Sequence, residues 1–157
     1  MQLYLIRHAH ALDLADDDAR PLSERGHGQV RLVAAFLRQS RGFAPREFWH
    51  SPLVRARETA VGLAAKIAAA GRLIETDGLR PEDDPAALVR RLRAGPESLA
   101  LVGHEPFMSA LASLLVAGDA TRPVFLFEKC AVLALEGAAD YWAVRWHIAP
   151  ALLGGEA

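Results

Sequence analysis

The chain begins Met1-Gln2-Leu3-Tyr4-Leu5-Ile6-Arg7-His8-Ala9-His10, an apolar run that ends on a basic pair. The run has no glycine or proline and is rich in β-prone side chains, so it predicts a short buried strand. A parallel α/β sheet places its chemistry at the carboxyl ends of its strands. Arg7 and His8 therefore stand where such a fold keeps its active site. Taken alone, the pair fits an ordinary loop edge better, so the rest of the chain must decide.

A second strand is predicted at residues 47–50, and another basic residue, Arg55, follows it. Ser51-Pro52 is a strong helix start, from which we expect a helix to about Ala69. Arg55 lies in its first turn, just past the end of the strand. Arg57 points away from Arg55, because residues two apart do not share a helix face. Arg55 is therefore the arginine expected at the strand end.

A third apolar run, at 98–102, predicts another buried strand. It ends at Gly103-His104-Glu105-Pro106, and a helix is expected from there to Ala117, with Gly118 as its stop. A second histidine thus lies between a strand and a helix N-terminus, which is a natural site for an anion.

Other patterns complete the expected architecture. Helices are predicted from Ser23, as the cap, to about residue 39 and over 86–93; β-like segments lie at 73–75, 125–127, 131–135 and 142–148. A turn over 137–140 makes the last two strands a hairpin, so at least one strand should be antiparallel. Trp142 and Trp146 are four apart and are expected on one face, and the tail from Pro150 is expected to be loose.

The composition predicts a single domain over residues 1–157, in a reducing, cytoplasmic setting. Hydrophobic residues make up 52% of the 157, enough for a real core, and the net charge of −1 gives no argument for nucleic acid or a membrane surface. Cys130 is the only cysteine, which excludes an internal disulfide and Cys-based zinc sites. No signal peptide precedes the first strand, and no apolar run is long enough to cross a bilayer.

The pair Arg7-His8, Arg55 and His104 follow three separate strands of the predicted sheet, so we expect these four residues to converge in one cleft. Two arginines and two histidines suit a tetrahedral dianion. Arginine binds phosphate oxygens bidentately, and a neutral imidazole can attack phosphorus and carry the phosphoryl group. The second histidine can hold an equatorial oxygen as charge develops on it.

These residues resemble the histidine phosphatase superfamily. Leu5-Ile6-Arg7-His8-Ala9 is similar to its signature, with Ala9 where glycine is usual; 51–56 with Thr59 is similar to its second motif and 103–106 to its third. The chain's size, its lack of inserts and Arg20-Pro21-Leu22-Ser23 resemble the SixA-type phosphohistidine phosphatases.

The resemblance implies a fold and a set of roles. The fold is a phosphoglycerate-mutase-like, three-layer α/β/α sandwich with a mostly parallel six-stranded sheet and one antiparallel strand. His8 would be the nucleophile, and Arg7, Arg55 and His104 would form the phosphate pocket, with no metal or other cofactor.

A general acid is the open part of this pattern. Many relatives that act on phosphate esters carry an acid in the loop after the third strand, where this chain has Glu82, Asp83 and Asp84. Glu82 is the weak candidate, and the alternative is a solvated acidic loop. An alkoxide leaving group needs a proton, whereas the imidazole that leaves from phosphohistidine needs less help.

Three other features are weaker. His10 with His8 forms a His-x-His pair that could bind a metal, but further ligands are not evident. The acidic run 16–18 is expected to be plain solvated surface rather than a cation site. Lys129, beside Cys130, could reach the rim of the cleft, but a single lysine in a loop is more simply expected to be solvated.

The sequence thus predicts a phosphatase that works through a phosphohistidine enzyme intermediate, with a phosphorylated partner, most simply a phosphohistidine protein. Alternatives on the same scaffold are a small-molecule phosphomonoesterase or a mutase. A catalytically silent phosphohistidine-binding module is the alternative from another class.

Overall fold

A computed structural model of the chain describes residues 1–40, 42–67, 71–138 and 141–155. The elements follow in the order β1 (Gln2–Arg7), α1 (Glu24–Gln39), β2 (Glu47–His50), α2 (Val54–Ala64), β3 (Arg72–Glu75), α3 (Pro85–Leu92), β4 (Ser98–Gly103), α4 (Phe107–Ala117), β5 (Val132–Ala138), β6 (Tyr141–Ile148) and the short 3-10 helix η1 (Pro150–Leu153).

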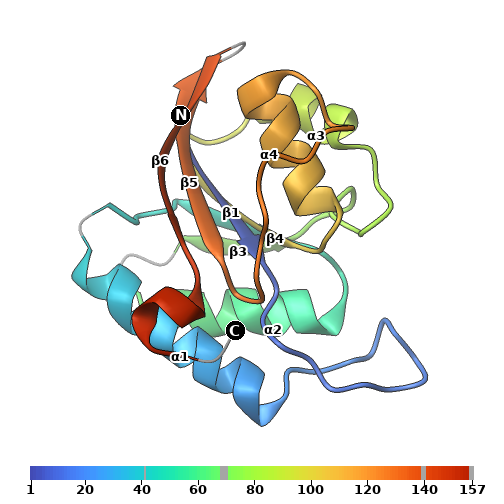
Figure 1. Cartoon of the computed structure of the whole chain (residues 1–157), viewed down its shortest axis with the longest axis vertical. Helices are drawn as coiled ribbons and strands as arrows, with labels where there is room; N and C mark the ends of the chain where they lie inside the picture. Colours follow the sequence, from blue (N-terminus) through green and yellow to red (C-terminus); the bar gives the residue numbers. More distant parts are fainter. Residues whose placement is uncertain (41, 68–70, 139–140, 156–157) are drawn as a thin grey trace.

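The six strands form one sheet in the order β3-β2-β4-β1-β5-β6 (Figure 1). β1 pairs in parallel with β4, and β2 pairs in parallel with both β3 and β4. β5 is antiparallel to both of its neighbours, β1 and β6. A mostly parallel sheet with one strand reversed is therefore confirmed.

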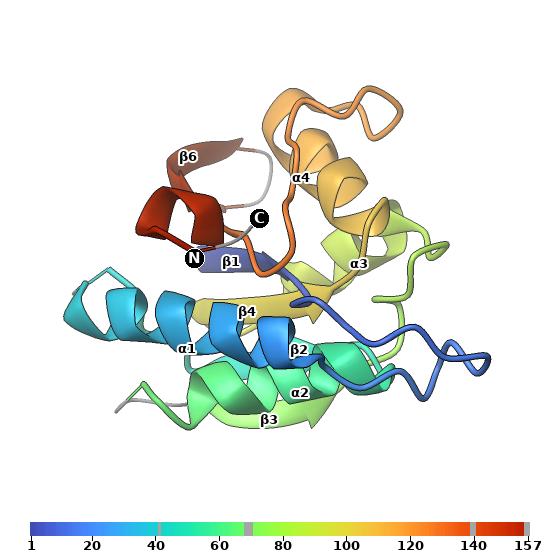
Figure 2. The ribbon, with the colours of Figure 1, turned by 60° about the horizontal axis from the view of Figure 1, so that its bottom comes forward.

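Helices cover both faces of the sheet, which confirms the three layers (Figure 2). Tyr4 and Ile6 of β1 pack into a core with residues of α1 and α2, and η1 lies against α1. Leu3 and Leu5 pack into the other core, with residues of α3 and α4. Because β1 is buried on both faces, its sequence is continuously apolar instead of alternating.

The helix after β2 is shorter than its sequence predicts. α2 begins at Val54 and ends at Ala64, instead of running from Ser51 to Ala69. Leu53 keeps an extended backbone (φ −66°, ψ 134°), so Pro52 lies outside the helix. Residues 65–67 form turns, because the chain must reverse to enter β3 at Arg72; residues 68–70 lie outside the described part. The predicted Ser23 cap is confirmed, since its hydroxyl accepts a hydrogen bond from the Gly26 amide.

The two tryptophans of β6 lie on opposite faces of the sheet, not on one. Ala134 pairs with Trp146 and Leu135 with Val144, so the register shifts by one residue between them. This irregularity reverses the alternation of side chains. Trp142 packs on the α3 and α4 side and Trp146 on the α1 and α2 side.

Two other expectations near the C-terminus are wrong. Residues 125–127 form no strand, because they are held by α4 instead of by a strand: Ser109 donates a hydrogen bond to the Phe125 carbonyl, and Ser113 accepts one from the Val124 amide. The segment that begins at Pro150 is not loose, because it forms η1, which packs against α1.

The turn predicted between the last two strands lies only partly within the described residues. Of the turn expected over 137–140, the first two residues end β5, and residues 139–140 lie outside the described part. Within the described residues, no helix has the length and apolar character needed to span a membrane.

Candidate active site

The carboxyl ends of β1 and β4 bring the two predicted histidines together. Arg7 is in register with Gly103, and the His8 amide donates to the Gly103 carbonyl at 2.9 Å. His8 and His104 follow directly, and their ring centroids are 5.0 Å apart. The loop that follows β1 extends beyond this edge of the sheet (Figure 2).

His8 is held in one orientation and one protonation state. Its Nδ1 lies 2.7 Å from the carbonyl oxygen of Ala9, which can only accept, so Nδ1 carries the proton and Nε2 keeps a free electron pair. The side chain is buried. Burial, followed by the charge of Lys129, lowers the pKa of His8 to about 2. The imidazole is therefore neutral and available as a nucleophile near neutral pH.

His104 is a buried polar side chain whose ring has no protein partner among the described residues. It is 1% exposed, and neither ring nitrogen has a hydrogen-bond partner among the described residues. Burial, followed by the charge of Arg55, lowers its pKa to about 3. Leaving such a group unpaired is costly, so the ring is suited to a ligand that supplies its partner.

The two arginines enter the site from different elements. Arg7, at the end of β1, donates from Nη1 to the Phe127 carbonyl at 2.6 Å, and its buried Nε has no partner. Arg55, in the first turn of α2, is 5% exposed. Arg57 is exposed, as its position on the helix predicted.

Thr59 links the second motif to the first. Its hydroxyl donates to the Arg55 carbonyl at 2.7 Å and accepts a hydrogen bond from the Ala9 amide at 3.0 Å. The same Ala9 residue orients His8 through its carbonyl. One threonine thus ties the nucleophile's neighbour to the helix that carries Arg55.

The acidic run after β1 is exposed, as predicted, but two of its carboxylates also pair with arginines, which the prediction of plain surface missed. Asp17 accepts from Arg55 at 2.9 Å through its carboxylate and at 2.5 Å through its backbone carbonyl. Asp18 pairs with Arg80 at 3.0 Å. Both carboxyl groups have lowered pKa values because these arginines, and Arg20 beside Asp17, donate hydrogen bonds to them. The run ties the loop to the arginine of the cleft.

Lys129 was expected to be solvated, with the rim of the cleft as the alternative, and the structure places it beside His8. Its Nζ lies 3.3 Å from Nε2 of His8. The available signal was the reversed strand: since β5 is antiparallel to β1, the residues just before β5 lie at the edge where β1 ends.

The three carboxylates of the acidic loop have different environments. Asp83 accepts a hydrogen bond from the Arg80 amide, and Asp84 caps α3 by accepting from the Ala86 amide. Glu82 is exposed. Among the described residues, no hydrogen bond or ion pair joins any of these carboxylates to His8 or His104.

His10 lies outside the cleft chemistry. Its Nδ1 is 2.8 Å from the Ser23 hydroxyl, at the cap of α1. Over the described ranges, no three His, Cys, Asp or Glu side chains gather where they could hold a metal ion.

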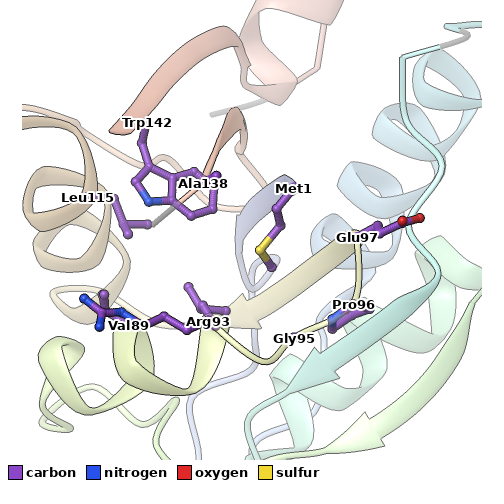
Figure 3. Close-up of a pocket in the computed structure, with 10 residues that line it drawn as sticks. Met1, Val89, Arg93, Gly95, Pro96, Glu97, Leu115, Ala138 and Trp142 are labelled. Atoms are coloured by element: carbon purple, nitrogen blue, oxygen red, sulfur yellow. The ribbon is translucent and has the colours of Figure 1, made fainter. Parts of the chain in front are cut away.

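A cavity of about 210 Å³ lies at the opposite end of the sheet (Figure 3). Met1 precedes β1, Glu97 precedes β4, and both line it together with Trp142. It is at the amino ends of these strands, so it is separate from the histidine cleft.

Comparison with known proteins matches this arrangement to a family. The sequence profile of the histidine phosphatase superfamily (branch 1) matches residues 3–83. The chain belongs to this superfamily. It is 34% identical to an uncharacterized protein of Picosynechococcus sp. over 88% of this chain and 87% of that one.

Two further relatives are SixA proteins. The phosphohistidine phosphatase SixA of Escherichia coli is 28% identical over 96% of this chain and 94% of its own. A solved structure of the protein histidine phosphatase SixA with tungstate has a TM-score of 0.88 at 25% identity, covering 98% and 99% of the two chains. Small-molecule phosphatases also share the fold. The protein is a phosphatase of the histidine phosphatase type.

Proposed function

We propose that this phosphatase transfers the phosphoryl group of its substrate to Nε2 of His8 and then to water, and that the substrate is a phosphohistidine side chain of a protein. The observation that carries the proposal is the fixed tautomer of His8, whose free electron pair faces the cleft shared with His104. Arg7, Arg55 and His104 supply the donors for the phosphoryl oxygens.

The reaction has two steps: the phosphoryl group is transferred first to His8 and then to water. The electron pair of Nε2 forms a bond to phosphorus, and the bond from phosphorus to the leaving atom breaks, with its electrons going to that atom. Water then attacks the phosphorus, the Nε2 bond breaks, and inorganic phosphate leaves. The cations and His104 stabilise the charge on the equatorial oxygens in both steps.

Two observations favour phosphohistidine as the substrate. The chain is similar over nearly its whole length to a protein named phosphohistidine phosphatase. Within the described residues, no hydrogen bond or ion pair joins Glu82, Asp83 or Asp84 to His8 or His104, so this loop shows no positioned acid for an alkoxide leaving group. An imidazole leaving group requires such an acid less.

The test is a turnover screen of the purified protein with EDTA present. Phosphohistidine peptides, an aryl phosphate and several alkyl phosphates are compared by kcat/KM. We expect phosphohistidine to be the best substrate, the aryl phosphate to follow, and EDTA to have no effect. A preference for an alkyl phosphate would assign the protein to metabolite phosphatases, and loss of activity with EDTA, restored by a divalent ion, would contradict the mechanism.

A further inference from the structure

We propose that Lys129 is a further catalytic residue, whose ammonium group binds an oxygen of the phosphoryl group while His8 attacks the phosphorus. The proposal rests on the function proposed above and extends the site to a residue outside its three sequence motifs.

The position of Lys129 relative to His8 carries the argument. Its Nζ is 3.3 Å from Nε2, the nitrogen with the free electron pair. Phosphorus must approach Nε2 from this side, so its oxygens come within reach of the ammonium. Once the bond to phosphorus uses the electron pair, the ammonium has no acceptor on His8 and takes a phosphoryl oxygen instead. Lys129 gives up no proton in this step.

The backbone around Lys129 is built to hold it there. The Ala131 amide donates to the Glu128 carbonyl at 3.1 Å, which closes a turn, and the Cys130 amide donates to the carbonyl of His8 itself at 3.2 Å. Cys130 has a φ of 61°, a left-handed conformation that is unfavourable for a non-glycine residue. Its buried side chain anchors the turn. Backbone strain of this kind concentrates at functional sites.

The charges around Lys129 favour an anion. No carboxylate pairs with its ammonium in the part of the chain that the structure describes. Burial, then the charges of Arg7 and Arg55, lowers the pKa of Lys129 to about 8, with Glu105 acting in the opposite direction. A dianion between these three cations would relieve their repulsion.

The first test compares three variants by kinetics and vanadate inhibition. Lys129→Met should lower kcat/KM and weaken vanadate inhibition by roughly ten- to hundredfold, as expected for loss of a hydrogen bond to a charged group. Lys129→Arg should restore part of both. Lys66→Met is the matched control, since Lys66 is exposed and is the only other lysine, and it should leave both values unchanged.

The second test needs no turnover, so its failure is distinguishable from failure of the proposed function. With only two lysines, acetylation of each can be followed by mass spectrometry. Vanadate should slow acetylation of Lys129 and leave that of Lys66 unchanged, also in the His8→Ala background. Equal acetylation of Lys129 with and without vanadate would overturn the proposal. So would a Lys129→Met variant that binds vanadate normally and only shifts the pH dependence of activity, because Lys129 would then act on His8 alone.

Discussion

A single carbonyl oxygen, that of Ala9, selects which nitrogen of His8 faces the cleft. The neutral state comes from burial and the neighbouring cations, which act in the same direction. His104 differs, because nothing in the described chain bonds its ring. The site thus contains one neutral imidazole of fixed tautomer, which suits the proposed nucleophile, and one ring without a protein partner among the described residues.

Replacing His8 tests the nucleophile directly. His8→Ala should reduce turnover by roughly three or more powers of ten, because no other group in the cleft replaces the lost electron pair. The fold should survive, since the buried His8 side chain belongs to neither hydrophobic core. Circular dichroism and turnover are measured together, with His27→Ala, at an exposed position, as the control. Wild-type turnover in His8→Ala would remove the mechanism.

At the scale of elements, α2 and the loop after β1 are coupled through Thr59. The coupling runs from the first turns of α2 to the Ala9 amide, and the adjacent carbonyl orients His8. Asp17 adds a second tie, from the same loop to Arg55. The geometry of the cleft therefore depends on how one helix docks against one loop.

Thr59→Val should test this coupling with little change in side-chain shape. The buried Ala9 amide would lose its acceptor, which costs about 1–3 kcal/mol of unfolding free energy. We also expect kcat/KM to fall, because the residue that orients His8 is released. Urea unfolding and kinetics are the measurements. The control is Thr76→Val, another buried threonine, which bonds Ile74 within its own segment. Equal loss of kcat/KM in both variants would show that Thr59 has no specific role.

The acidic loop between β3 and α3 offers a test of the leaving-group chemistry. Glu82→Gln should change phosphohistidine turnover little, because the leaving imidazole needs no strong acid. If a phosphate ester were the substrate, the same change should cost about two to four powers of ten for an alkyl phosphate and less for an aryl phosphate. Asp84→Asn serves as the control, since Asp84 caps α3. A large loss on phosphohistidine in Glu82→Gln would make this carboxylate a general acid.

At the scale of the whole molecule, the two histidines at the carboxyl ends of β1 and β4 make the stability of the fold depend on pH. His8 and His104 have folded-state pKa values near 2 and 3, whereas an unfolded histidine titrates near 6.5. Below pH 6.5 the unfolded chain therefore binds more protons than the folded one. Stability is unaffected by these groups above pH 6.5 and falls as pH decreases below it.

This linkage predicts a measurable loss of stability in mild acid. At pH 5, each of the two histidines should cost about 2 kcal/mol of unfolding free energy relative to pH 7.5. Urea unfolding at the two pH values measures the loss. His8→Ala should lose about 2 kcal/mol less than the wild type over this interval, and His27→Ala should lose as much as the wild type. Identical losses in the wild type and His8→Ala would show that His8 is not buried in its neutral form.

Local sequence determined much of this protein. Three features depend only on a few neighbouring residues and can be predicted without a structure: the apolar run of β1, the Ser23 cap and the Gly118 stop of α4. Parallel strands end at a common edge, which is why Arg7, His8, Arg55 and His104 could be expected in one cleft before any distance was known.

The tertiary structure decided what depends on contacts between distant segments. The direction of β5 brings Lys129 to His8, 121 positions away. The fold of the loop after β1 makes the exposed Asp17 a partner of Arg55. One irregularity between β5 and β6 places Trp146 on the opposite face of the sheet from Trp142. Each outcome was set by pairing and packing across the sheet, which local propensity does not encode.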